Sequence, residues 1–529
     1  MMAPTRRELL SSAAAVTAMS CLSGPLAAAT QRRRPPNVIV IYSDDLGYGD
    51  VGCYGATQVK TPNIDRLAAE GVRFTQGHCP SATCTPSRYA LLTGDYAWRN
   101  PHAHILPGDA PALIKPGKDT MASMFKRAGY TTAVIGKWHM GLGEGNLDWN
   151  GRIAPGPLEI GFDYGFYFPA TLDRVPCVYI ENHNVVNLDP GDPIKVSYVD
   201  KVGNDPTGLD HPELLRMMWN DGHNGTIIDG VSRIGFMEGG HAARWVDEDM
   251  ADTLLGKAKA FMEKNRDDPF FIYYATSEIH VPRLPAKRFQ GTTNMGPRGD
   301  SIVELDWVVG EIVNTVKQLG LDEDTLILFS SDNGPVLNDG YDDEAVTRVG
   351  NHRPSGFYRG GKYGIYDGGL MVPTIARWPG TIPSGVTSDA LIDHVDLFAS
   401  LASIVGQKLP QASAVDSFDL APVLLGRSGA GRNYVVEDTS TINAEQATLK
   451  DHGDSIVALV VGKWKVIQPH NPVASFHGND IGSEPAPQLY NLEEDPGETV
   501  NMADRYPERT KAMLARLDAI LKSDRTRPA

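Results

Sequence analysis

The chain has 529 residues, more than one ordinary domain needs, so a large domain with a smaller second one is expected. Hydrophobic residues make up 41% and charged residues 22%, as in soluble globular proteins that bury a large core. The formal net charge of -16 argues against nonspecific nucleic-acid binding, which needs a broad basic surface. It does not exclude a small anionic substrate, because a local cluster of cations can reverse the field inside one cleft.

The first 29 residues predict an export signal. Arg6 and Arg7 precede an apolar run over 9–22, and alanines at 27–29 offer a cleavage site. The paired arginines are typical of twin-arginine signals, and the predicted destination is the periplasm or the outside of the cell. A lipoprotein site at Cys21, the general secretory route and an uncleaved disordered tail stay open as alternatives.

Five cysteines are too few for a disulfide scaffold in a chain of this length. The sequence holds no C-x-x-C pair, which argues against a thiolate zinc site. Whether any of Cys53, Cys79 and Cys177 pair with one another is left open.

Four near-continuous apolar runs, typical of strands in a parallel sheet covered on both faces, alternate with helical patterns. The fold class predicted is therefore α/β, with a large mostly parallel sheet flanked by helices. In the first predicted helix Thr61 is expected to cap the start and Gly71 to mark the end. The predicted strands are 37–43, 131–135, 270–275 and 325–331, and the predicted helices are 61–71, 121–129 and 300–319.

Two further regions differ from this alternation. Residues 169–243 have weak periodicity and predict an insertion that shapes the mouth of a site. Residues 455–467 predict an antiparallel hairpin with its turn at Gly462 and Lys463, and 507–521 predict a closing helix. We therefore expect a catalytic domain over 30–430 and a smaller C-terminal α+β domain over 431–529.

Each of the four predicted strands is followed by side chains that ionise or bind metals. The carboxyl ends of parallel strands share one edge of an open sheet, and ligands bind there. Polar residues also follow strands simply because loops are solvated, which is the alternative for any single case. The residues in question are Asp44 and Asp45, Lys137 and His139, His280, and Asp332 and Asn333.

The segment Cys84-Thr85-Pro86-Ser87-Arg88 predicts a helix start with a cysteine just before it. Free N–H groups at a helix start favour an anion, and Arg88 lies one turn further on. The alternative is an incidental buried cysteine.

This segment matches the C-x-P-S-R element of the formylglycine-dependent sulfatases, in the alkaline-phosphatase-like superfamily, and the resemblance covers nearly the whole chain after the predicted signal. Six further segments match that family, and the occurrence of all of them in this order is specific, although each short string could arise by chance. The other matching segments are VIVIYSDDLGYGDVGCYG, TPNIDRLAAEGVRF, AGYTTAVIGKWHMG, SSDNGP, RGGKYGIYDGG and LYNLEEDPGE.

The resemblance implies that a maturation enzyme oxidises Cys84 to formylglycine, which also faces a metal ion. It implies one Ca²⁺, with Mg²⁺ as the alternative, and hard cations of this kind prefer oxygen ligands such as these side chains offer. The metal ligands implied are Asp44, Asp45, Cys84, Asp332 and Asn333.

The resemblance also implies a sulfuric ester hydrolase. Arg88, Lys137 and Lys362 would bind the sulfate group. The hydrated aldehyde of formylglycine would attack sulfur and leave a sulfated enzyme, while His280, assisted by Lys362, protonates the departing alcohol. His139 would then remove a proton so that sulfate is expelled.

The sequence gives only weak indications of which residues would recognise the alcohol part of the sulfate ester. A paired carboxylate and guanidinium, Asp173 and Arg174, can grip a sugar diol, and His102 and His104 are candidates to line the pocket. The segment 170–182 resembles family members that act on sulfated galactose or N-acetylgalactosamine. The first hypothesis is therefore a carbohydrate sulfatase acting on a 6-O-sulfated galacto-configured sugar.

Two alternative functions stay open. Phosphonate and phosphate ester hydrolases share this kind of cysteine element and metal site. A protein whose Cys84 is never oxidised could bind carbohydrate without turning it over.

Overall fold

The computed structural model describes residues 34–439, 455–471 and 476–528. The predicted signal over 1–29 lies outside these residues, so the export prediction stays a prediction. Within the described ranges, no helix combines the length and the apolar character needed to cross a membrane.

The core is a ten-stranded sheet whose five central strands, β13-β1-β12-β4-β5, run parallel. Strand β1 is buried at every residue, as its uninterrupted apolar sequence requires for a strand covered on both faces. Antiparallel pairs extend the sheet on both sides, and β15 pairs parallel with β2 at one edge. In spatial order the strands are β15 (Val386–Ser388), β2 (Val72–Phe74), β14 (Thr374–Arg377), β13 (Thr325–Ser331), β1 (Asn37–Ser43), β12 (Phe270–Ala275), β4 (Thr131–Lys137), β5 (Tyr164–Phe168), β6 (Ile180–Glu181) and β7 (Asn184–Val185).

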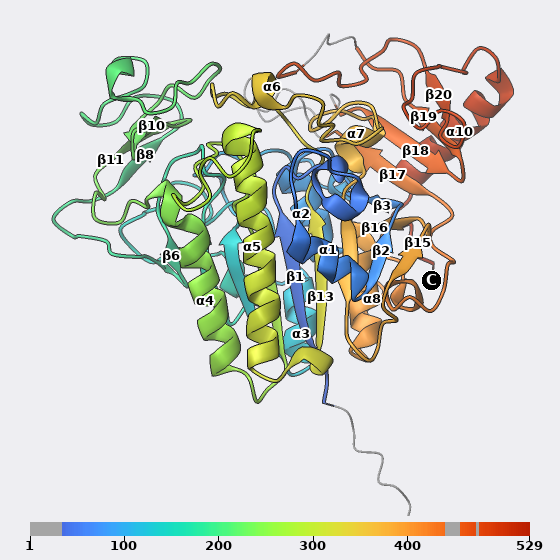
Figure 1. The fold of residues 1–529 in the computed structure, drawn as a ribbon, viewed down its shortest axis with the longest axis horizontal. Helices are drawn as coiled ribbons and strands as arrows, with labels where there is room; N and C mark the ends of the chain where they lie inside the picture. Colours follow the sequence, from blue (N-terminus) through green and yellow to red (C-terminus); the bar gives the residue numbers. More distant parts are fainter. Residues whose placement is uncertain (1–33, 440–454, 472–475, 529) are drawn as a thin grey trace, which may run out of the picture. The chain divides into compact units, whose positions relative to one another are not determined.

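Helices cover both faces of this sheet. Figure 1 shows α4 and α5 lying across one face with α1 beside them, while α2, α3 and α8 pack together on the other. The predicted α/β class is thereby confirmed. The helices are α1 (Pro62–Ala69), α2 (Cys84–Thr93), α3 (Met121–Arg127), α4 (Met250–Lys264), α5 (Gly296–Gln318), α6 (Ala345–Arg348), α7 (Asp367–Leu370), α8 (Leu397–Ile404), α9 (Ala421–Leu424) and α10 (Pro507–Leu521).

Most predicted bounds agree with the structure, and the exceptions have local causes. Helix α1 ends at Ala69, before the predicted Gly71, and Thr61 does not cap it through its side chain. Instead the Thr61 hydroxyl accepts from Gly52 N at 2.8 Å and donates to Asp65 at 3.1 Å. Helix α3 ends at residue 127, α5 begins at residue 296, and β4 continues to residue 137.

Residues 169–243 contain short strands joined by loops, in keeping with the weak sequence periodicity. Two small antiparallel pairs form there, β8 (Lys195–Ser197) with β11 (Phe236–Glu238) and β9 (Ile227–Ile228) with β10 (Val231–Ser232). A further pair, β3 (Gly77–His78) with β16 (Ile392–Asp393), lies outside the insertion and joins segments that are far apart in the sequence. Figure 1 shows β8, β10 and β11 of this insertion at the upper left, while its strands β6 and β7 belong to the main sheet.

The C-terminal region forms a four-stranded antiparallel sheet with α10 against it. The predicted hairpin is confirmed. Lys465, buried in this sheet, lies 2.6 Å from Asp367 of α7, so a buried ion pair links the two parts. The position of the predicted domain boundary at 430 and 431 stays a prediction. The strands are β17 (Val435–Asp438), β18 (Val457–Val461), β19 (Trp464–Ile467) and β20 (Gln488–Asn491).

Candidate active site

The neighbouring parallel strands β1 and β13 end at the same level, since Ser43 pairs in register with Ser331. The residues that follow them therefore meet. Asp45 N donates to Asp332 at 3.3 Å, and Asn333 Nδ2 donates to Asp45 at 2.8 Å. All four polar residues that follow these two strands are buried.

The side-chain oxygens of these four residues, with Cys84 beside them, form a cluster suited to a hard cation. Ligand atoms of Asp44, Cys84 and Asp332 all lie within 4.8 Å of one another. Among the described residues, Asp44 Oδ1 and Asn333 Oδ1 are buried and have no hydrogen-bond partner. Buried oxygen atoms need such partners, and a divalent cation would satisfy both. Burial also raises the pKa of Asp44 to about 6, which marks a place where a negative charge lacks full compensation.

Two cations face the same carboxylates. Arg88 holds Asp332 Oδ2 through Nε at 2.9 Å and Nη2 at 2.7 Å, and Lys137 Nζ lies 2.6 Å from Asp44 Oδ2. Burial acts to raise the pKa of Asp332, but Arg88 and Lys137 lower it. Both cations are fully buried, so they are placed to bind an anion away from bulk water.

Cys84 is the first residue of α2, one position further into the helix than predicted, and Thr83 precedes it as the cap residue. Its side chain is 2% exposed. Burial raises the pKa of the thiol, so a reactive thiolate is disfavoured. An unmodified Cys84 would therefore be a poor nucleophile.

His139 and His280 are each held in one orientation. His139 Nε2 donates to the Leu106 carbonyl at 2.9 Å, which leaves Nδ1 of the neutral ring as the free base. Burial and the nearby Lys137 lower the pKa of His139. His280 Nδ1 donates to the Val281 carbonyl at 2.7 Å. Its Nε2 faces the site.

Lys362 lines the same pocket as Cys84 and is buried. Its ammonium donates to Asp45 at 2.9 Å and to Asp339 at 2.8 Å, and it lies 3.3 Å from His280 Nε2. An acid and a base in such contact can exchange a proton.

A narrow pocket of about 20 Å³ adjoins Cys84, and it shares Ile105 and Arg174 with a wider hollow of about 350 Å³. Asp173 and Arg174, predicted to recognise the substrate, both line the pocket. Burial acts to raise the pKa of Asp173, but Arg174 and His280 lower it, so the carboxylate stays charged. The pocket is lined by Cys84, Ile105, Asp173, Arg174, His223, His280, Asp339, Lys362, Tyr363 and His477.

Five of these residues, Ile105 among them, were not predicted. His223 comes from the insertion and hydrogen-bonds Asp173 at 2.9 Å, while His477 comes from the C-terminal region. Asp339 and Tyr363 lie in loops after β13 and before α7. None of them follows a strand directly, so the strand-end pattern could not find them.

His102 and His104 are not among the residues that line this pocket. His102 is exposed, and His104 Nδ1 contacts the Ile105 carbonyl at 3.0 Å. The structure therefore gives neither histidine a place beside Cys84.

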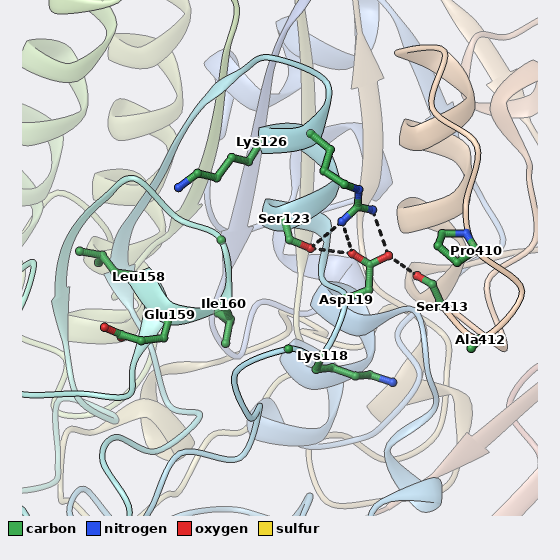
Figure 2. A pocket seen from close by; sticks show the side chains of 13 residues that line it. Lys118, Asp119, Ser123, Lys126, Leu158, Glu159, Ile160, Pro410, Ala412 and Ser413 are labelled. Atoms are coloured by element: carbon green, nitrogen blue, oxygen red, sulfur yellow. Dashed lines mark hydrogen bonds and ion pairs between the residues drawn. The ribbon is translucent and has the colours of Figure 1, made fainter.

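A separate hollow of about 670 Å³ lies beside α3 (Figure 2). Asp119 at its wall forms an ion pair with Arg127 at 2.6 Å and also accepts from Ser123 and Ser413, so its charge is already compensated. None of the predicted catalytic residues lines it. The pocket beside Cys84 therefore remains the candidate active site.

Comparison with known proteins agrees with this geometry. A family model described as "Sulfatase" matches residues 36–407. The chain is 47% identical to an N-acetylgalactosamine-6-O-sulfatase of Bacteroides thetaiotaomicron, with 94% of each chain covered. It is 33% identical to human arylsulfatase A, over 90% of this chain and 85% of that one.

The fold also matches solved structures. One, from a study of glycosaminoglycan metabolism by Bacteroides thetaiotaomicron, has a TM-score of 0.88 and 46% identity, and covers 93% of this chain and 100% of that one. A phosphonate monoester hydrolase of Agrobacterium radiobacter has a TM-score of 0.57 at 18% identity, covering 92% of this chain and 95% of that one. That second likeness concerns the fold alone.

Proposed function

The chain belongs to the sulfatase family and is a sulfuric ester hydrolase, and from this premise we propose that its substrate is a 6-O-sulfated N-acetylgalactosamine or galactose. The observation that carries the proposal is the pocket beside Cys84. There Asp173, Arg174 and His223 present a carboxylate, a guanidinium and an imidazole to the alcohol half of the substrate. Such groups suit sugar hydroxyls. The bacterial relative that is 47% identical carries the corresponding activity in its name.

We further propose that Asp44, Asp45, Asp332 and Asn333 hold one Ca²⁺, together with Cys84 oxidised to formylglycine. The unpartnered oxygens of Asp44 and Asn333 support this, as do donors that are oxygen atoms throughout once Cys84 is oxidised. When present, the cation and the aldehyde supply a polarised oxygen nucleophile that the thiol of Cys84 cannot provide.

The remaining roles belong to side chains already placed. Arg88, Lys137 and Lys362 bind the sulfate oxygens, and their charges stabilise the negative charge that builds up during transfer. Lys362 and His280 lie in contact, so together they can deliver a proton to the departing sugar oxygen. His139, neutral and with Nδ1 free, accepts a proton when sulfate leaves.

The proposal also covers the localisation of the protein and the enzyme that would oxidise Cys84. Arg6, Arg7 and the apolar run after them support export, where polymeric sulfated carbohydrates are found. Oxidation of Cys84 requires a maturation enzyme made by the same cell.

The test is a panel of sulfated mono- and oligosaccharides that differ in sulfate position and sugar configuration, with released sulfate measured. Turnover should be greatest for 6-O-sulfated galacto-configured sugars. Turnover of gluco-configured or 2-O-sulfated sugars alone would refute the sugar, and turnover of aryl sulfates alone would refute a carbohydrate substrate. A phosphate monoester in the same panel tests the phosphoester alternative.

The covalent part has its own test. Mass spectrometry of the peptide around Cys84 should find formylglycine in active protein. Cys84→Ala should fold normally, as judged by circular dichroism, and release no sulfate. Active protein that carries only unmodified cysteine contradicts the proposal.

A further inference from the structure

Lys362 has two carboxylate partners in the folded protein, and only one of them belongs to the proposed cation site. Asp45 lies in the acidic cluster there, whereas Asp339 is in neither of the clusters that could hold a metal ion among the residues that the structure describes. We propose that Asp339 is a positioning residue that holds Lys362 when a divalent cation binds, and thereby frees the Asp45 carboxylate for that cation. The inference rests on the proposed function only through the cation.

Asp339 is fixed for this role. It is 4% exposed, Lys362 Nζ donates to its Oδ2 at 2.8 Å, and the Tyr363 hydroxyl donates to its Oδ1 at 2.9 Å. His477 Nε2 lies 3.9 Å from the same Oδ1. Each carboxylate oxygen thus has a donor already, so the side chain is oriented toward Lys362 rather than free to turn to a sugar.

The two partners of Lys362 compete differently with a cation. Asp45 Oδ2 receives the lysine at 2.9 Å, while its Oδ1 receives Asn333 at 2.8 Å. A cation bound between the strand ends draws on the same Asp45 carboxylate and on the free Asn333 oxygen, so it competes with the lysine for the charge of Asp45. A buried ammonium without a carboxylate is strongly unfavourable, so the lysine would resist cation binding if Asp45 were its single partner.

Asp339 removes that conflict. With Asp339 in place, Lys362 keeps one short charged contact after Asp45 turns to the cation. The ammonium also stays beside His280 Nε2, where the departing oxygen needs a proton. The lysine and the cation can therefore occupy the site together.

The experiment is a calcium titration of chelator-treated full-length protein, followed by the midpoint of thermal unfolding, with no substrate present. Asp339→Asn should raise the half-saturating calcium concentration by about tenfold or more, because Asp45 must then serve both lysine and cation. Tyr363→Phe removes only the hydroxyl that orients Asp339, and it should raise that concentration by a smaller factor.

Asp342→Asn is the matched control. Asp342 lies three positions further along the same loop, is exposed, and accepts from Asn220 at 2.7 Å. Its calcium titration should match that of the unsubstituted protein.

An unchanged half-saturating concentration in a folded Asp339→Asn protein overturns the inference, and so does an unsubstituted protein that shows no response to calcium. If Asp339→Asn does not fold, Tyr363→Phe decides by the same measure. Since the titration needs no turnover, a protein that binds calcium normally but releases no sulfate refutes the proposed function and leaves the role of Asp339 intact.

Discussion

At the scale of single residues, His139 is tied to one chemical state by its surroundings. Burial and Lys137 lower its pKa, so the ring stays neutral below pH 6.5, and its hydrogen bond to Leu106 leaves Nδ1 as the base. We expect His139→Ala to lower kcat by about 10²- to 10⁴-fold, the usual contribution of a general base. The kcat profile of the unsubstituted protein should show no fall near pH 6.5 due to this residue. An acid limb near pH 6.5 that His139→Ala abolishes would contradict the assignment.

Asp173 differs from His102 in its position relative to the pocket, although both were predicted to meet the substrate. Asp173 lines the pocket, so Asp173→Ala should lower kcat/KM for the sulfated sugar by about 10- to 100-fold, as for a lost charged hydrogen bond. A small aryl sulfate has no hydroxyls to grip and should be turned over nearly as before. His102→Ala should leave both rates unchanged because that side chain is exposed. Equal losses on both substrates after Asp173→Ala would mean that the change disturbs the catalytic groups.

The sequence could predict the site residues that follow strands, because the edge of a parallel sheet gathers them whatever the rest of the chain does. It could not predict His223 or His477. These two reach the pocket from an insertion and from the C-terminal region, through loop paths that no periodic pattern records. Neither could a pattern show that His102 is exposed and is not among the pocket residues.

At the scale of elements, helix α5 carries a buried acid that should make stability depend on pH. Burial and the nearby Glu278 raise the pKa of Glu304 from 4.5 to about 9. Between these values the folded protein binds more protons than the unfolded chain, so its stability falls as pH rises. Glu304→Gln keeps the shape without the charge, and it should lessen this fall by on the order of 1–3 kcal/mol. Thermal midpoints at pH 6 and pH 9 measure it, with Glu311→Gln on the same helix as the control; parallel curves for Glu304→Gln and the unsubstituted protein would refute the shift.

Strands β1, β12 and β13 were predictable at their ends because each is a buried apolar run with polar residues on both sides. The antiparallel strand β14 was not, since it has only four residues and no alternation. Direction is set by the connections between strands, and the connection over 332–373 that leads to β14 holds only two four-residue helices, which give no periodic pattern.

At the scale of the whole molecule, folding brings three carboxylates from distant parts of the chain to one point, and a cation should offset their repulsion. Removing the cation with a chelator should abolish sulfate release and lower the midpoint of thermal unfolding by a few degrees. A shift of that size is expected in a large protein when the cation concentration is about 100 times its Kd. Ca²⁺ or Mg²⁺ should restore both. Elemental analysis that finds stoichiometric zinc would contradict an oxygen-ligand site for a hard cation.

The burial of Cys84 determines whether its proposed oxidation can occur before or after folding. A side chain that is 2% exposed at the start of a packed helix is out of reach of another enzyme once the chain has folded. The oxidation of Cys84 proposed above would therefore have to come first, while the segment around it is still an open peptide. A twin-arginine route carries folded cargo, so on that route the oxidation would be completed before the protein leaves the cytoplasm. Molecules that fold before Cys84 is oxidised would stay inactive for as long as they remain folded. The specific activity of a preparation would therefore measure the fraction of molecules that were oxidised before they folded.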